Sequence, residues 1–130
     1  MSQYKILIAD DEPVVLEIMS RKIAASGYKV VNAKNGQEAW DKIQSESPDI
    51  ILLDLIMPEM DGISVLSKLR ANPPSRKWIP VIIITALGEQ EHVKQAMELQ
   101  ADHYMVKPVT IEEVLKAMQL MISLIPLRNT

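Results

Sequence analysis

The stretch from residue 50 to 62, IILLDLIMPEMDG, constrains the fold more than any other part of this 130-residue chain. Four aliphatic residues precede a single carboxylate, Asp54, and Pro58 ends the apolar run that resumes after it. An apolar run this short and uniform is typical of a strand that is buried on both faces in the middle of a parallel sheet. Such a strand can carry a charge only at its end. Asp54 is therefore predicted at the carboxyl end of a central strand, where ligands bind in open α/β sheets.

Strand-like and helix-like patterns alternate along the whole chain. Start signals for helices stand near residues 13, 36, 62, 89 and 111, and each follows a predicted strand. This alternation predicts an α/β fold with a doubly wound, five-stranded parallel sheet and helices on both of its faces. The expected strand order is 2-1-3-4-5, the order of flavodoxin-like sheets, and residues 1–130 are expected to form a single domain. The predicted strands are 4–9, 28–31, 50–53, 79–84 and 103–106.

The sequence makes specific predictions for two of the helices. The last helix is expected to begin with a capping box formed by Thr110 and Glu113, and its apolar residues follow a regular helical period. The helix that starts at residue 89 is expected to place four residues on one side: Val93, Ala96, Met97 and Gln100.

Composition excludes several kinds of site. The chain has no Cys, so disulfides, thiolate metal sites and cysteine nucleophiles are ruled out. Its net charge is −3 and its Lys and Arg residues are dispersed, which does not favour nucleic-acid binding. No apolar run approaches the roughly 18 residues of a membrane helix, and acidic residues by position 10 argue against a signal peptide. A cytoplasmic domain that does not bind membranes is expected.

Charged or hydroxyl side chains stand at the ends of four predicted strands: Asp10 with Asp11, then Asp54, Thr85 and Lys107. In the order 2-1-3-4-5 these strands are consecutive neighbours, about 4.8 Å apart, so their ends converge on one shallow pocket. Three carboxylates this close repel one another, and a divalent cation relieves the repulsion. Oxygen ligands without Cys or His favour Mg²⁺ or Mn²⁺ over zinc.

A metal ion, an ammonium group and a hydroxyl around one carboxylate suit a phosphoryl group. Carboxylates act as nucleophiles on phosphorus, and this transfer needs in-line placement and charge neutralisation more than a general base. Asp54 is therefore predicted to become an aspartyl phosphate. Taken singly, Asp10 and Asp11 could be an acidic helix start, and Lys107 could be a solvated lysine. The agreement of four strand ends is what supports the prediction.

The chain resembles the receiver domain of two-component response regulators. The matching segments are collinear and cover essentially the whole chain: ILIADDEP at 6–13, AKNGQEAW at 33–40, PDIILLDLIMPEMDG at 48–62, IPVIIITA at 79–86 and ADHYMVKP at 101–108. The resemblance implies the flavodoxin-like (βα)5 receiver fold. It also implies a phosphoryl group supplied by a histidine kinase or a histidine phosphotransfer protein, and a signalling domain rather than an enzyme.

The resemblance assigns roles at the metal and phosphoryl site. Asp54 is the phosphoacceptor, Asp11 binds Mg²⁺ directly, and Asp10 holds it mainly through water. The backbone carbonyl of Ile56 is the third protein contact to the metal. Thr85 and Lys107 contact the phosphoryl oxygens.

The resemblance also implies a switch. Thr85 moves toward the phosphoryl group and Tyr104 turns inward behind it. This change repacks the face made by the fourth helix, the fifth strand and the fifth helix, which a downstream protein or effector domain reads. The same face is a candidate for phosphorylation-dependent homodimerisation. The first helix, through Val14, Val15 and Met19, is the expected docking ridge for the phosphoryl donor.

Some positions depart from the family pattern. Gln100 stands where a glycine often precedes the Ala-Asp pair, which could change the end of the fourth helix, and Val109 replaces a frequent Phe. The family tunes the phosphoryl lifetime two residues beyond the aspartate and two beyond the threonine. Here these residues are Ile56 and Leu87. Both are apolar and cannot orient an attacking water, so slow self-dephosphorylation is expected.

Other functions fit the residues less well. A flavodoxin-like cofactor binder would need a phosphate-cradling loop after the first strand, where Asp10 and Asp11 would repel a phosphate. A phosphatase with an aspartyl nucleophile would carry a second acid at the position of Ile56. A degenerate receiver that acts only as a phosphorylation-independent interaction scaffold is the remaining alternative, and the presence of every expected site residue argues against it.

Overall fold

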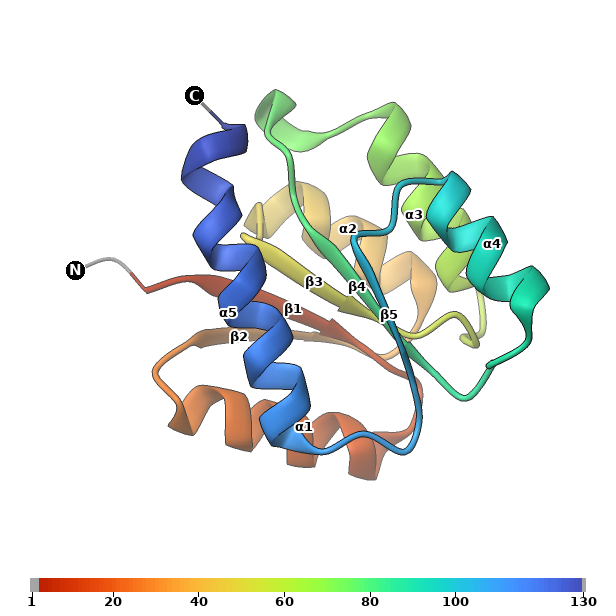
Figure 1. The fold of residues 1–130 in the computed structure, drawn as a ribbon, viewed down its shortest axis with the longest axis horizontal. Coiled ribbons are helices and arrows are strands. Elements are labelled where there is room, and N and C mark those ends of the chain that lie inside the picture. The colour runs from red at the N-terminus through yellow and green to blue at the C-terminus, as the bar shows by residue number, and fades with distance from the viewer. Residues whose placement is uncertain (1–2, 130) are drawn as a thin grey trace.

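The computed structural model describes residues 3–129, and all five of its strands are parallel in the order β2-β1-β3-β4-β5 (Figure 1). The predicted fold class and strand order are confirmed. The strands are β1 (Lys5–Ala9), β2 (Lys29–Ala33), β3 (Ile50–Leu53), β4 (Val81–Thr85) and β5 (His103–Val106). The helices are α1 (Pro13–Ala25), α2 (Gly36–Glu46), α3 (Gly62–Ala71), α4 (Gln90–Glu98) and α5 (Ile111–Arg128), with a short 3₁₀ helix η1 (Pro74–Arg76).

The sheet separates two apolar layers, because successive strand residues point to opposite faces. On one face, Leu7 and Ala9 of β1 pack in a cluster that includes residues of α2, α3 and α4. On the other face, Ile6 and Ile8 pack in a cluster that includes residues of α1 and α5. Figure 1 shows α5 crossing in front of the sheet, with α1 beside it. This two-layer packing leaves the carboxyl edge of the sheet to the loops.

The central position of β3 explains its uniform apolar sequence. The strand lies between β1 and β4, and all four of its residues are buried. Its ladder pairs Leu53 with Ala9 on one side and with Ile83 on the other. The next residues after Ala9 and Leu53 are Asp10 and Asp54. The register of the sheet therefore brings the two carboxylates to the same edge.

Three strands differ from their predicted bounds: β1 begins at Lys5 rather than at residue 4, and the bounds of β4 and β2 differ for identifiable reasons. β4 begins at Val81 rather than at residue 79, because Pro80 has no backbone N–H for the ladder, although its carbonyl accepts a bond from Ile51 N. β2 extends to Ala33 because Asn32 and Ala33 still pair with β1. An asparagine is a weak strand residue by propensity, and here the neighbouring strand overrides it.

The prediction for the start of α5 is confirmed, whereas the prediction for α4 is wrong at its end. The capping box at α5 is confirmed, since Thr110 Oγ1 accepts a bond from Glu113 N at 3.1 Å and the Glu113 carboxylate bonds back to Thr110 N. The prediction that α4 places four residues on one side is wrong at Gln100. The helix ends at Glu98, and Gln100 lies beyond it in the left-handed region, with φ of 68°. Its carbonyl accepts a bond from Arg70 Nη2 at 2.9 Å.

Across residues 3–129, every helix is too short or too polar to cross a membrane.

Candidate functional site

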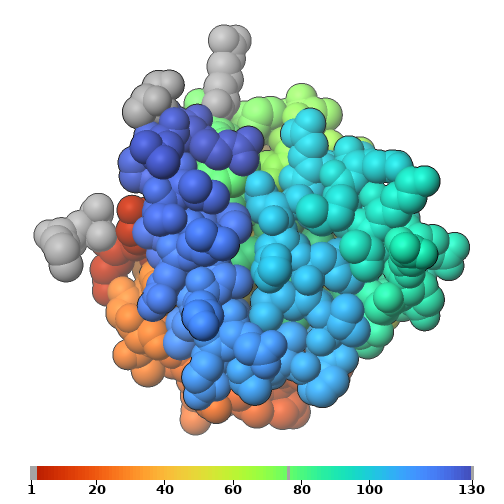
Figure 2. Space-filling model, viewed as in Figure 1, coloured from red at the N-terminus to blue at the C-terminus, as the bar shows by residue number. Residues whose placement is uncertain are grey.

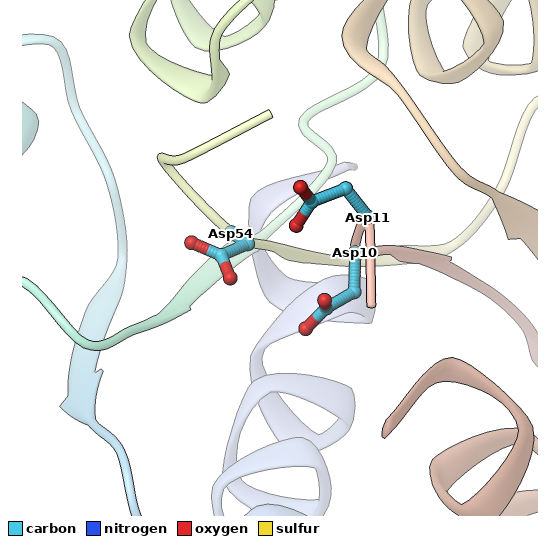
Figure 3. A group of neighbouring side chains, drawn as sticks. All are labelled: Asp10, Asp11 and Asp54. Atoms are coloured by element: carbon cyan, nitrogen blue, oxygen red, sulfur yellow. The ribbon is translucent and has the colours of Figure 1, made fainter. Parts of the chain in front are cut away.

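Three carboxylates meet where β1 and β3 end (Figure 3). The backbone places two of them, because Asp10 N donates to Ala33 O at 3.1 Å and Asp54 N donates to Ala9 O at 3.0 Å. Asp10 and Asp54 are only 3% and 4% exposed, whereas Asp11 is exposed. One oxygen from each carboxylate lies within 4.8 Å of the others. The predicted cluster is therefore present, with two members inside the protein and one facing solvent.

Lys107 joins the two buried carboxylates. Its Nζ lies 2.8 Å from Asp10 Oδ2 and 2.9 Å from Asp54 Oδ2. The lysine is placed by β5, because Lys107 N continues the ladder with a 2.8 Å bond to Thr85 O. Burial lowers the pKa of Lys107, but its hydrogen bonds and charge interactions with Asp10 and Asp54 outweigh burial and raise the pKa above its ordinary value. The lysine is thus a fixed positive charge at the site.

Asp10 and Asp54 are held in the same way. In each residue, Oδ1 accepts a hydrogen bond from the backbone amide two residues later. Glu12 N donates to Asp10 Oδ1 at 2.9 Å, and Ile56 N donates to Asp54 Oδ1 at 3.0 Å. In each, Oδ2 faces Lys107. Four contacts thus fix two adjacent carboxylates. Their orientation is set before any ligand binds.

Thr85 and Tyr104 connect through the loop between β4 and α4. Thr85 is fully buried as the last residue of β4, and its Oγ1 accepts a 3.4 Å bond from Leu87 N. The Tyr104 hydroxyl donates to Leu87 O at 2.5 Å, and its ring packs against the cluster on the α2–α4 side. Burial raises the pKa of Tyr104, and the negative charges of Glu89 and Asp54 add to the shift. The sequence placed these residues in one switch but gave no sign that Leu87 links them.

The donor set fits a hard divalent cation. The three carboxylates supply only oxygen atoms, which is the ligand type that Mg²⁺ and Mn²⁺ prefer. Ile56 lies two residues after Asp54, and its amide is bonded to the Asp54 carboxylate. The assignment of its carbonyl as a metal ligand stays a prediction.

The expected docking ridge lies on α1 beside the site. Val14 is 67% exposed, while Val15 and Met19 are partly buried. A groove lined by Val15, Met19 and Lys107 runs between α1 and the segment after β5. Ile18 also lines this groove and is 49% exposed, although it was not among the ridge residues predicted from the sequence. Ile18 stands between Val15 and Met19 in the sequence, and this position could have identified it as part of the ridge.

A family model described as the response regulator receiver domain matches residues 6–119. The chain belongs to the response regulator receiver domain family. In this chain, acidic residues follow β1 and β3, and Lys107 follows β5. The matched region contains all four charged residues of the site: Asp10, Asp11, Asp54 and Lys107.

Curated relatives of this receiver domain include transcriptional regulators. The alkaline phosphatase synthesis transcriptional regulatory protein PhoP of Bacillus subtilis is 38% identical over 110 residues, covering 85% of this chain and 45% of the relative. The probable transcriptional regulator ycf27 of Cyanophora paradoxa is 38% identical over 114 residues, covering 88% of this chain and 46% of the relative. The receiver domain thus spans just under half the length of these relatives.

Solved structures show the same architecture. A CheY-like response regulator receiver domain protein from Methanospirillum hungatei has a TM-score of 0.88 at 27% identity, covering 94% of this chain and 95% of that one. The receiver domain of the Francisella response regulator 1452 has a TM-score of 0.85 at 30% identity, covering 93% of this chain and 98% of that one. The receiver fold is therefore matched along nearly the full length of each chain.

Proposed function

We propose that this receiver domain accepts a phosphoryl group on Asp54 from a histidine kinase or a histidine phosphotransfer protein, in a reaction that requires Mg²⁺. The observation that carries the proposal is the group of Asp10, Asp11, Asp54 and Lys107. It surrounds one buried carboxylate with two more acids and a fixed ammonium. A buried charge held this firmly would be costly for a structural role alone.

In the proposed transfer, a carboxylate oxygen of Asp54 forms a bond to phosphorus while the P–N bond of the donor phosphohistidine breaks. The electron pair of that bond stays on the imidazole nitrogen, which then takes up a proton. Lys107 Nζ is 2.9 Å from Asp54 Oδ2, close enough to neutralise the oxygens of an arriving phosphoryl group. The group that is modified is Asp54 of the domain itself. The domain is therefore proposed to act as a signalling protein and not as an enzyme on other substrates.

Asp10, Asp11 and Asp54 would hold the metal ion, with the Ile56 carbonyl as a further contact. The ion supplies positive charge that neutralises phosphoryl oxygens. Mn²⁺ has the same preference for oxygen ligands and is expected to replace Mg²⁺. Asp10 and Asp54 each turn Oδ2 to Lys107, so the lysine stabilises both carboxylates when no metal is bound.

The signal is proposed to leave through the face formed by α4, β5 and α5. Figure 2 shows these three segments side by side on one continuous surface. Tyr104 lies on β5 and bonds to Leu87 in the loop before α4, and Leu87 also bonds to Thr85, so a change at Thr85 would reach this face through Leu87. Met97, Val106 and Leu120 expose apolar side chains on these elements. The face is proposed to bind a downstream protein or effector domain, and a second copy of the phosphorylated chain is a further candidate.

The proposal is tested by the intact mass of the protein after incubation with acetyl phosphate, with and without Mg²⁺. We expect a single phosphoryl adduct that requires Mg²⁺ and is absent from Asp54→Asn. Asp41→Asn is the matched control, because Asp41 is an exposed carboxylate on α2. No adduct in any condition, with an intact fold by circular dichroism, would reject the proposal and favour the interaction scaffold.

A further inference from the structure

The loop between β3 and α3 contains a strained turn close to the candidate metal site. Met60 N donates to Pro58 O at 2.8 Å across a single residue, Glu59, whose φ is 70°. A three-residue turn with positive φ is rare and strained for a residue with a side chain. Strain of this kind persists only where the surrounding structure holds it in place.

The contact that holds this turn comes from the first residue of α2. Gly36 N donates to the same Pro58 O at 3.3 Å, which satisfies one of the amides left without a partner at a helix start. A Cβ on Gly36 would lie 1.6 Å from Met60 O and 2.4 Å from Met60 C. These are backbone atoms, so no side-chain rotation could relieve the overlap. Any other residue at position 36 must push the helix and the loop apart.

The start of the loop is fixed by separate contacts. Asp54 Oδ1 accepts the bond from Ile56 N at 3.0 Å, and Gly62 N donates to Leu55 O at 3.0 Å. Gly62 itself sits against the backbone, since a Cβ there would lie 2.3 Å from Asp54 O. Between these anchors, Pro58 lies only two residues after Ile56. The Ile56 carbonyl lies on the Pro58 side of the anchored Ile56 N, so a shift of the turn at Pro58 would displace it.

We propose that Gly36 is a positioning residue for the metal site. By letting α2 touch the loop backbone, it sets where the Ile56 carbonyl lies relative to the carboxylates of Asp10, Asp11 and Asp54. The inference rests on the proposed function, because it concerns the same Mg²⁺ site. Mg²⁺ requires nearly ideal octahedral geometry, so a small displacement of one ligand weakens its binding. The fold is less sensitive, because α2 is anchored in the core by Ala39 and Ile43.

The test is Mg²⁺ binding to Gly36→Ala, measured by calorimetry without any phosphoryl donor. We expect the dissociation constant to rise roughly tenfold, the size typical of residues that support metal ligands. With acetyl phosphate, the Mg²⁺ concentration for half-maximal phosphorylation should rise by the same factor. The maximal rate at saturating Mg²⁺ should stay near the wild-type value. Unchanged Mg²⁺ affinity in a folded Gly36→Ala variant would overturn the inference.

Two controls separate positioning from general damage to α2. Gln37→Ala changes the neighbouring, exposed residue and should bind Mg²⁺ as wild type does. Ala39→Gly loosens the same helix without placing an atom against the loop. If Ala39→Gly weakened Mg²⁺ binding as much as Gly36→Ala, Gly36 would have only a structural role.

A measurement on the wild-type protein covers the case in which Gly36→Ala does not fold. The backbone amide resonance of Gly36 should shift when Mg²⁺ binds, while that of Gly27, after α1, should not. A Gly36 resonance that stays fixed during Mg²⁺ saturation would count against the inference. Failure of the wild-type protein to bind Mg²⁺ at all would instead reject the proposed function.

Discussion

Lys107 Nζ lies 2.9 Å from Asp54 Oδ2, although the two residues are 53 positions apart in the chain. The oxygen that faces the lysine belongs to the carboxylate proposed to receive the phosphoryl group. An ammonium in this position neutralises part of the negative charge at the site before a donor arrives. It also makes Asp10 and Asp54 compatible with burial, because each would otherwise be an unpaired buried charge.

Lys107→Met should therefore destabilise the protein in the absence of divalent metal. We expect the free energy of unfolding to fall by about 3 kcal/mol, since two buried carboxylates would lose their common partner. Urea denaturation with a metal chelator measures this loss, and added Mg²⁺ should restore part of it. Lys116→Met, at an exposed lysine of α5, is the control. Equal stability of the two variants would contradict the role given to Lys107.

The phosphoryl lifetime should depend on Ile56 and Leu87. Ile56→Asn and Leu87→Glu each introduce a polar group that can orient water, so each should shorten the phosphoryl half-life. A roughly tenfold change corresponds to about 1.4 kcal/mol in the barrier. The half-life is followed by intact mass after the phosphoryl donor is removed. Leu120→Asn, an exposed residue of α5, should leave it unchanged, and lifetimes that did not shorten in either test variant would refute the prediction.

Tyr104 should titrate at higher pH in the folded protein than in the unfolded chain. Burial is the main cause of its raised pKa, followed by the charges of Glu89 and Asp54. Because the folded state retains the proton longer, the contribution to stability is intact below the ordinary pKa of 10.0 and is lost as the pH rises through the raised pKa.

The check is the ultraviolet absorbance of tyrosinate in wild type and in Tyr104→Phe. Subtracting the two titrations should leave one component with a midpoint above pH 10.0. A difference curve centred at or below that value would contradict the partly buried position of Tyr104 and its hydrogen bond to Leu87 O.

Gln100→Gly should keep or raise the stability of the protein. Gln100 has a φ of 68°, a conformation that costs a residue with a side chain about 1 kcal/mol and costs glycine little. Gln95→Gly, inside α4, should instead lower the free energy of unfolding by about 1 kcal/mol. Thermal or urea unfolding of the two variants gives the comparison. The same sign of change in both would contradict a left-handed conformation at Gln100.

Much of the site could be predicted because its residues stand at strand ends. Apolar runs that stop at Asp10, Asp54 and Lys107 fix the position of each side chain along the sheet, and the parallel topology brings the three ends to one edge. The capping box at Thr110 was predictable for a similar reason, because its two partners are only three residues apart.

Contacts between distant loops could not be predicted in this way. No periodicity shows that Tyr104 bonds to Leu87 O, or that Gly36 touches the backbone of Met60. The sequence marked Gln100 as a departure at a position where a glycine is frequent, but it did not predict the left-handed conformation, because the expected α4 pattern included this residue. Each of these features depends on three-dimensional packing rather than on local sequence preference.

The ion pairs of Lys107 with Asp10 and Asp54 affect how the protein is expected to behave when Mg²⁺ is scarce. Here the amino group of Lys107 is an ion-pair partner for two of the three acids, and it is part of the chain itself. On the proposed function, magnesium starvation would therefore silence the domain while leaving it intact. The response could then resume as soon as the ion returned, without the delay of making new protein.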